Sequence, residues 1–150
     1  MKERIKIPTV LPEGYKAMAG FARYLEQTSL KPQHKELIKI RASQINGCAY
    51  CVDMHSRDAR RLGETEQRLY VLSIWRDTSF FTEEEKAVLA LTEEVTLIHQ
   101  RVSDATYEHA IAVLGEQYVA EVIMAAIIIN GWNRIGVATE MMPAPETVTQ

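Results

Sequence analysis

The chain has 150 residues, of which 47% are hydrophobic and 25% charged, and its formal net charge is -3 at pH 7. This length is enough for one compact domain, which buries about 70% of its unfolded surface and needs no disulfide or metal to hold a core. The composition excludes a disordered or collagen-like chain, and the charge argues against a nucleic-acid partner and a polybasic membrane-binding surface.

The predicted elements begin with an extended arm over residues 1–13, which holds two prolines. Helical spacing of apolar residues, together with capping residues and terminal glycines, then predicts about six or seven helices. They cover residues 14–27, 32–46, 48–62, 65–75, 82–98, 103–115 and 116–138. No strand-like alternation of useful length interrupts this pattern. We therefore predict an all-α helical bundle that forms a single domain over residues 1–150.

Local signals agree on where these helices begin and end. Gly47 and Gly63 are natural stops for the second and third helices. Thr82 and Glu85 have the spacing of a capping box, which opens the fifth helix. The last helix is apolar on nearly all sides around residues 124–129, which is typical of a helix central in a bundle or buried between subunits.

The chain carries only two cysteines, Cys48 and Cys51, too few for a secreted disulfide scaffold. The first twelve residues lack the apolar core of a signal peptide. The longest apolar run, residues 122–129, is far short of the roughly 20 residues that span a bilayer. We therefore expect a cytoplasmic protein with no membrane partner. In that reducing compartment a close cysteine pair is more often catalytic, redox-active or metal-binding than structural.

Cys48, Cys51 and His55 share one face of the third helix, since at 100° per residue they lie within about 60° of one another. The cysteines stand where the helix begins, and the free amide groups and the helix dipole there favour a thiolate. A thiolate attacks a peroxide oxygen or a disulfide, and a second cysteine resolves the product. His55, one turn after Cys51, is placed to exchange a proton with that thiol.

Glu36 is the fourth candidate. If the helices on either side of Gly47 fold back on each other, Glu36 and His55 lie at similar distances from the turn, eleven and eight residues away. At a rise of about 1.5 Å per residue, their axial positions differ by only about 4–5 Å. We therefore predict a proton relay in the order Glu36, His55, Cys51.

The pattern Glu36-x11-Cys48-x-x-Cys51-x-x-x-His55 resembles the alkylhydroperoxidase AhpD core of the carboxymuconolactone decarboxylase-like family. The flanking residues fit as well: Asn46-Gly47 before the cysteines and Ala59-x-x-Leu62-Gly63 after them. The resemblance covers a motif-bearing core of about residues 15–100. The C-terminal helices, at about residues 103–138, hold a segment at 130–134 that also looks like the end of family members.

The resemblance implies an oxidoreductase, a thiol-dependent peroxidase with an antioxidant role that assembles into homotrimers or homohexamers. Cys51 is then the nucleophile that becomes a sulfenic acid, Cys48 closes the disulfide, and Glu36 and His55 relay protons. A dithiol donor such as a lipoyl or thioredoxin-like protein recharges the pair, so no metal, haem, flavin or other cofactor is expected. The chain departs from the pattern at Tyr50, where the best-studied members carry a histidine; tyrosine does not buffer a proton near pH 7.

Other interpretations stay open. Glu36, Cys48, Cys51 and His55 are acceptable zinc ligands, which would suit a zinc-binding or non-catalytic oligomeric bundle. The chain can also act on another small molecule, with the cysteine pair serving as a redox switch. The true lactone decarboxylases of the family lack this cysteine pair, which disfavours decarboxylation.

Overall fold

The computed structural model of the protein describes residues 4–146, and every regular element in that part of the chain is helical. The all-α prediction is therefore confirmed. The helices are α1 (Ile7–Val10), α2 (Pro12–Tyr24), α3 (Pro32–Asn46), α4 (Ala49–Arg61), α5 (Glu66–Tyr70), α6 (Glu83–Thr96), α7 (Asp104–Leu114) and α8 (Glu116–Ala138). Short 3-10 segments follow α2, α5 and α6: η1 (Leu25–Gln27), η2 (Leu72–Asp77) and η3 (Ile98–Gln100).

The N-terminal arm differs from its prediction, because part of it is helical. The single turn α1 begins at Ile7 with Pro8 in its first turn, and α2 begins directly at Pro12. Proline is preorganised for the first turn of a helix, where no amide donor is needed, so both prolines start helices instead of holding an extended chain. Residues 1–3 of the predicted arm lie outside the described residues.

The helix ends follow the local signals in the sequence. Gly47 adopts the left-handed conformation, with φ of 69°, and ends α3 as a C-cap. The side chain of Thr82 accepts a hydrogen bond from the amide of Glu85, whose carboxylate accepts the amide of Thr82 in return. This complete capping box starts α6. At α7, the side chain of Ser103 caps the helix by accepting the amide of Thr106.

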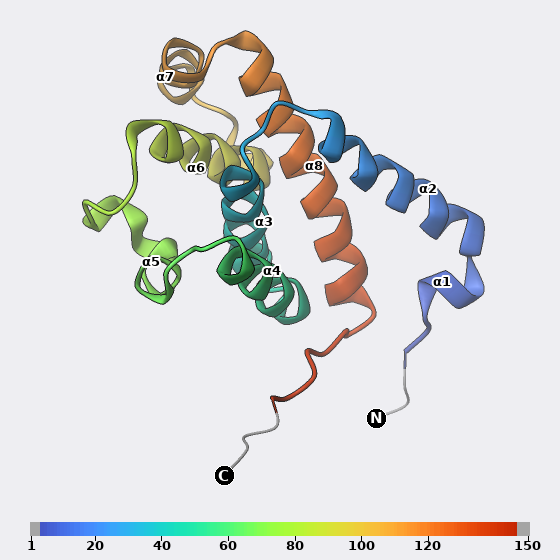
Figure 1. Cartoon of the computed structure of the whole chain (residues 1–150). Coiled ribbons are helices and arrows are strands. Elements are labelled where there is room, and N and C mark those ends of the chain that lie inside the picture. The colour runs from blue at the N-terminus through green and yellow to red at the C-terminus, as the bar shows by residue number, and fades with distance from the viewer. Residues whose placement is uncertain (1–3, 147–150) are drawn as a thin grey trace.

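Helix α3 is central to the bundle, since it packs against α4, α6 and α8 (Figure 1). One buried cluster joins α3, α6 and α8 and includes Ile38, Val88, Val122 and Ile129. A second cluster joins α3, α4, α6 and η2 and includes Leu37, Ala59, Leu72, Trp75 and Leu89. Because neighbours cover α3 on several sides, three of its polar residues, His34, Glu36 and Ser43, are buried.

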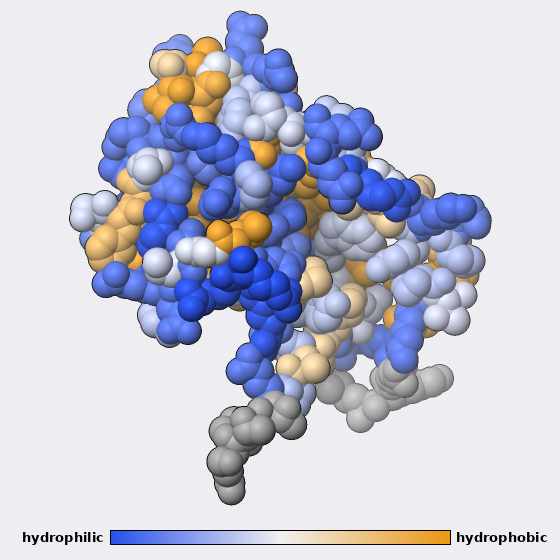
Figure 2. Space-filling view, viewed as in Figure 1, coloured by the Kyte–Doolittle hydropathy of each residue, from blue (hydrophilic) through white to orange (hydrophobic). Residues whose placement is uncertain are grey.

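Helix α2 lies along the edge of the bundle beside α8, and none of its residues is buried (Figure 1). The face shown in Figure 2 is mainly hydrophilic, with hydrophobic side chains gathered over α7. Within residues 4–146, no helix is both long and apolar enough to cross a membrane.

Candidate active site

The α3–α4 hairpin holds the four predicted site residues. The chain reverses at Gly47, and the amide of Cys48 donates to the carbonyl of Ser43 at 3.0 Å, which closes the end of α3. Cys48 is then the N-cap of α4, and its Sγ accepts the amide of Cys51 at 3.3 Å. The predicted third helix therefore begins one residue later than expected, with Cys48 as its cap.

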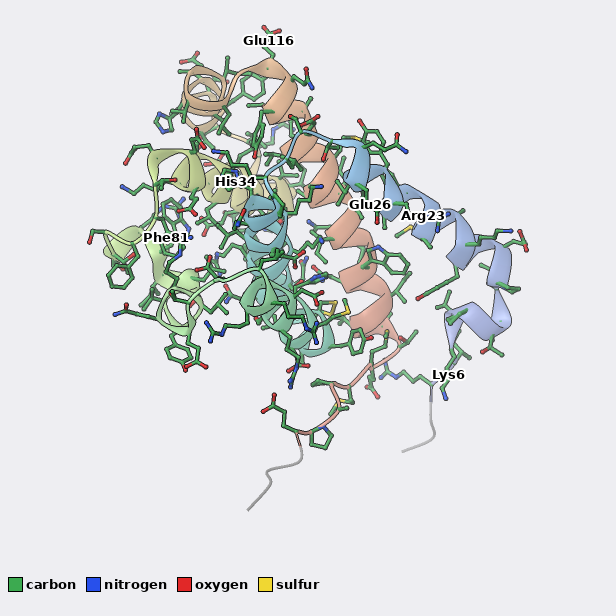
Figure 3. All side chains as sticks on the ribbon, viewed as in Figure 1. Lys6, Arg23, Glu26, His34, Phe81 and Glu116 are labelled. Carbon is green, nitrogen blue, oxygen red and sulfur yellow. A yellow bond between two sulfur atoms is a disulfide. The ribbon has the colours of Figure 1, made fainter. Side chains whose placement is uncertain are left out.

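Cys48 and Cys51 are joined by a disulfide, with their Cα atoms 5.3 Å apart. In Figure 3 the yellow sulfur–sulfur bond lies between α4 and α8. Both residues are buried, with exposed fractions of 2% for Cys48 and 4% for Cys51. The pair therefore sits in the structure as the closed form of a dithiol, at the start of a helix where a thiolate is stabilised once the bond opens.

Glu36 and His55 meet across the hairpin, as the spacing from Gly47 predicted. His55 Nδ1 lies 3.0 Å from Glu36 Oε2, and both side chains are buried. Lys39 occupies the other carboxylate oxygen, with its Nζ donating to Glu36 Oε1 at 2.8 Å. Lys39 was not predicted as a site residue. Its position three residues after Glu36 on the same helix could have predicted this ion pair.

Three influences set the pKa of Glu36. Burial raises the pKa, but the hydrogen bond from His55 and the ammonium group of Lys39 outweigh burial, so the pKa lies below its ordinary value. Glu36 is therefore a carboxylate at neutral pH and accepts the Nδ1 proton of His55. That bond assigns the tautomer of neutral His55 and leaves its Nε2 able to accept a proton.

An apolar cavity of about 360 Å³ opens beside the cysteine pair. Cys51 and His55 line it from α4, and Lys35 and Lys39 line it from α3. Glu26 adds a carboxylate from η1. The apolar wall comes from α2, η1, α4, α8 and the segment after α8, and comprises Tyr15, Ala22, Leu25, Tyr50, Met54, Ala125, Ile128, Ile129, Trp132, Ile135 and Met141. Cys51 is among the described residues that line this cavity, and Cys48 is not.

The wall residues were missed as site residues by sequence reasoning, because their apolar spacing looks the same in a core and in a cavity. Trp132 packs edge-on against Tyr15, with ring centroids 5.3 Å apart, and so joins α8 to α2 at the cavity. Tyr50, the position that departs from the family pattern, borders the cavity and also faces the segment around Pro143 and Pro145. Tyr50 therefore lines the cavity and takes no part in the Glu36–His55 contact.

A partly buried amide network fixes α8 against the end of α3. Asn46 Nδ2 donates at 2.9 Å both to Asn130 Oδ1 and to Asn133 Oδ1. Asn133, only 1% exposed, donates in turn to the hydroxyl of Ser43 at 2.8 Å. These bonds satisfy the amide side chains that follow the apolar middle of α8 and hold the helix next to the turn that carries Cys48.

The residues that could hold a metal in the structure differ from the zinc ligands considered from the sequence. With both sulfurs in a disulfide, Cys48 and Cys51 offer no thiolate to a metal. Glu36, His55 and Asp58 do bring ligand atoms within 4.8 Å of one another. Lys39 already bonds to Glu36, and Arg61 pairs with Asp58 at 2.5 Å, so cations of the protein occupy this group.

Comparison with known proteins finds relatives that span nearly the whole chain. The model of the Carboxymuconolactone decarboxylase family matches residues 12–94, which contain all four candidate residues. An uncharacterized protein of Bacillus subtilis, YdfG, is 44% identical over 139 residues, which cover 92% of this chain and 95% of the relative. These matches confirm the resemblance inferred from the cysteine motif.

Solved structures agree with the sequence matches. A protein of unknown function from Agrobacterium tumefaciens, for which an identity as the antioxidant defence protein AhpD has been suggested, has a TM-score of 0.93 at 36% identity, covering 97% of this chain and 100% of the other. The debrominase Bmp8, solved in complex with 2,3,4-tribromopyrrole, has a TM-score of 0.81 at 18% identity, covering 89% of this chain and 72% of the other. The second likeness concerns the fold alone.

Proposed function

The chain belongs to the carboxymuconolactone decarboxylase family, and we propose that it is a thiol-dependent peroxidase that reduces hydroperoxides at Cys51. The observation that carries this proposal is the asymmetry of the cysteine pair. Of the two cysteines, Cys51 borders the apolar cavity together with His55, whereas Cys48 is not among the described residues that line it. A substrate in the cavity therefore meets Cys51 first.

The proposed cycle has two halves: the hydroperoxide oxidises the cysteine pair, and a dithiol donor reduces it again. The Cys51 thiolate attacks the distal oxygen of the hydroperoxide, the O–O bond breaks, and the alcohol leaves after taking up a proton. Cys51 is now a sulfenic acid, and the Cys48 thiol condenses with it to form the disulfide and release water. A dithiol donor then supplies two electrons and two protons, restores both thiols, and closes its own disulfide.

Glu36 and His55 serve this cycle as a proton relay. In the reduced protein, His55 Nε2 accepts the proton of the Cys51 thiol and later delivers it to the departing alkoxide. Glu36 holds the Nδ1 proton at 3.0 Å and stabilises the imidazolium that forms between these steps. Burial of the Glu36–His55 pair strengthens this interaction, because water screens it little.

The partners follow from the cycle and from the surface of a single chain. The cavity takes the hydroperoxide, and the donor is a dithiol of the lipoyl or thioredoxin-like kind in the cytoplasm. We also propose a homotrimer or homohexamer, because α2 buries none of its residues in the single chain. An apolar groove between α6, α7 and α8, with Ile98, Tyr107 and Ile127 exposed along it, supports the same proposal.

A second candidate is a thiol-dependent reaction on another small apolar molecule, with the cysteine pair as the store of two electrons. The observation that favours it is the apolar wall of the cavity, which selects for an apolar body without requiring a peroxide group. Turnover of a panel of aromatic and aliphatic hydroperoxides, compared with non-peroxide analogues of the same shape, separates the two functions.

The test of the peroxidase proposal is the turnover of Cys51→Ser and Cys48→Ser with a hydroperoxide and a dithiol donor. Both variants lose multi-turnover activity. Cys48→Ser still consumes about one equivalent of peroxide and accumulates a sulfenic acid at Cys51, detectable with a sulfenic-acid-specific reagent, whereas Cys51→Ser consumes none. Undiminished turnover in either variant contradicts the proposal.

The relay is tested in the same assay. Glu36→Gln and His55→Gln each lower kcat/KM by roughly 100-fold, the scale of positioned acid–base catalysis. Glu108→Gln and His99→Gln are the matched controls, since both residues are exposed and neither lines the cavity. If the controls fall as far as the site variants, the relay has no special role.

A further inference from the structure

Gly136 of α8 lies directly against the disulfide. A Cβ atom built on Gly136 would stand 2.8 Å from Cys48 Sγ and 3.7 Å from Cys51 Sγ. The shorter separation is closer than carbon and sulfur atoms approach without overlap, so any side chain at this position displaces one of the two groups. The sulfur has little freedom to move, because it is bonded to Cys51 and is buried under α8.

The backbone of Gly136 does not itself require glycine. The positive-φ glycines among the described residues are Gly47, Gly63 and Gly115, whereas Gly136 has the ordinary conformation of a helix. Glycine within a helix costs about 0.5–1 kcal/mol relative to alanine. The reason for glycine at this position is therefore the space that the sulfurs need.

The approach of α8 to the sulfurs is held in place by its polar anchors. Asn133 is three residues before Gly136 and so lies on the same face of α8. Its bonds to Ser43 and Asn46 tie that face to the last turn of α3, within a few residues of Cys48. Farther along, the carbonyl of Gly136 accepts the amide of Met141 at 2.9 Å, which ends the helix. Because Asn133 is tied to α3 one turn before Gly136, α8 cannot easily move away from an added methyl group.

We infer that Gly136 is a positioning residue for the cysteine pair: it leaves room for the closed disulfide, and a methyl group there shifts the equilibrium toward the open dithiol. In the disulfide, Cys48 Sγ is confined by its bond to Cys51. Reduction takes up two electrons and two protons from an external dithiol, which becomes a disulfide, and the freed Cys48 side chain can rotate to another staggered rotamer. The crowding therefore destabilises the oxidised form more than the reduced form.

The inference rests on the proposed function only in taking the pair to open and close reversibly, and its test uses no peroxide. Full-length wild type and Gly136→Ala are equilibrated with graded mixtures of reduced and oxidised dithiothreitol or glutathione. The free thiols are then alkylated and counted by mass spectrometry. We expect the ratio of dithiol to disulfide in Gly136→Ala to rise at least tenfold at a given buffer, a shift of about 30 mV for a two-electron couple.

Gly131→Ala is the matched control. It makes the same change in the same helix, and its Cβ would also stand 2.8 Å from a neighbour, but that neighbour is the terminal methyl of Met18, which can swing away. The ratio of dithiol to disulfide in Gly131→Ala should stay within about twofold of wild type. An unchanged ratio in Gly136→Ala, a shift toward the disulfide, or an equal shift in Gly131→Ala overturns the inference.

A second comparison decides the matter if Gly136→Ala does not fold. In a Cys48→Ala background the sulfur is gone, so a methyl group at position 136 enters vacated space. The denaturation midpoint of the double variant should be no lower than that of Cys48→Ala alone. A lower midpoint would show that Gly136 makes room for some other group, and the inference would be wrong. A protein with a shifted redox ratio but no peroxidase activity would refute the proposed function and leave this inference standing.

Discussion

The carboxylate of Glu36 is buried between an imidazole and an ammonium group. His55 and Lys39 each bond to one of its oxygens, and together they more than offset the cost of burying its charge. An acidic group placed in this way stabilises the fold only while it is ionised. The acid stability of the protein therefore reports on the same contact that orients His55 for the proposed relay.

The pH dependence follows from the lowered pKa of Glu36. An unfolded glutamate has a pKa of about 4.3, and the folded-state pKa is lower. The stabilisation by Glu36 is therefore fully present above the unfolded pKa and is lost as the pH falls through the folded pKa. Below about pH 4, the free energy of unfolding should fall less steeply for Glu36→Gln than for wild type, as measured by urea denaturation at a series of pH values.

The comparison with a variant is needed because other buried glutamates, among them Glu85 and Glu93, also have lowered pKa values through their arginine partners. These glutamates make the free energy of unfolding fall more steeply at acid pH, and they do so equally in wild type and in Glu36→Gln. If the free energy of unfolding of wild type and of Glu36→Gln fell in parallel at acid pH, ionisation of Glu36 beside His55 and Lys39 would not contribute to stability.

The pairing of Glu36 with His55 could be predicted from the sequence, because the two residues are nearly equidistant from Gly47 and a hairpin must bring them together. The cavity could not be predicted in this way. Its wall depends on where α2 and α8 come to lie against α3 and α4, and the apolar spacing of Trp132 or Ile128 is the same for a packed core as for a binding site. The need for glycine at position 136 could not be predicted either, because it arises only from the close approach of α8 to the sulfur of Cys48.

At the scale of elements, the junction between α3 and α8 decides the geometry of the site. Asn133 is fully buried and joins Ser43 and Asn46, at the end of the helix that precedes Cys48. Since buried amides must be paired, this network selects one axial position of α8 relative to the hairpin. That position brings Gly136 to the sulfurs and Trp132 to the cavity.

Removing this anchor should be costly. Asn133→Ala deletes one buried and one partly buried hydrogen bond and leaves a small void, while Ser43 and Asn46 each keep another partner. We expect a loss of roughly 2 kcal/mol in the free energy of unfolding, measured by urea denaturation.

The exposed residue Gln117 on the same helix supplies the control, since Gln117→Ala should change stability by less than about 0.5 kcal/mol. If both variants were equally stable, the network would not hold α8 in register.

Most helix boundaries could be predicted because caps and glycines mark them in the sequence. The second helix was predicted over residues 32–46, and α3 has these bounds. The one-turn helix α1 was missed, because four residues are too few to show a helical period. The segment η1 and most of η2 were predicted as parts of the neighbouring helices, whereas η3 begins where the predicted fifth helix ends.

At the scale of the whole molecule, a single chain leaves apolar surface without cover. Helix α2 has no buried residue, and Ile98, Tyr107 and Ile127 are between 46% and 59% exposed around one groove. A stable monomer rarely shows a large contiguous apolar patch, which supports the proposed assembly of several copies.

Sedimentation equilibrium tests the assembly. Three or six chains of 17.0 kDa give a mass of about 51 or 102 kDa. Ile127→Glu should lower that mass by placing a charge in the groove, whereas Tyr70→Glu, at an exposed tyrosine of α5, should leave it unchanged. A wild-type mass of one chain would contradict the proposed oligomer without touching the chemistry of the cysteines.

The central claim is that Cys48 and Cys51 form their bond during turnover. The most direct test adds one equivalent of a hydroperoxide to the fully reduced protein and follows its mass. We expect a loss of two mass units, mapped by digestion to a Cys48–Cys51 link, with one equivalent of alcohol released. If the reduced protein keeps its mass and both thiols while the peroxide persists, the claim is wrong.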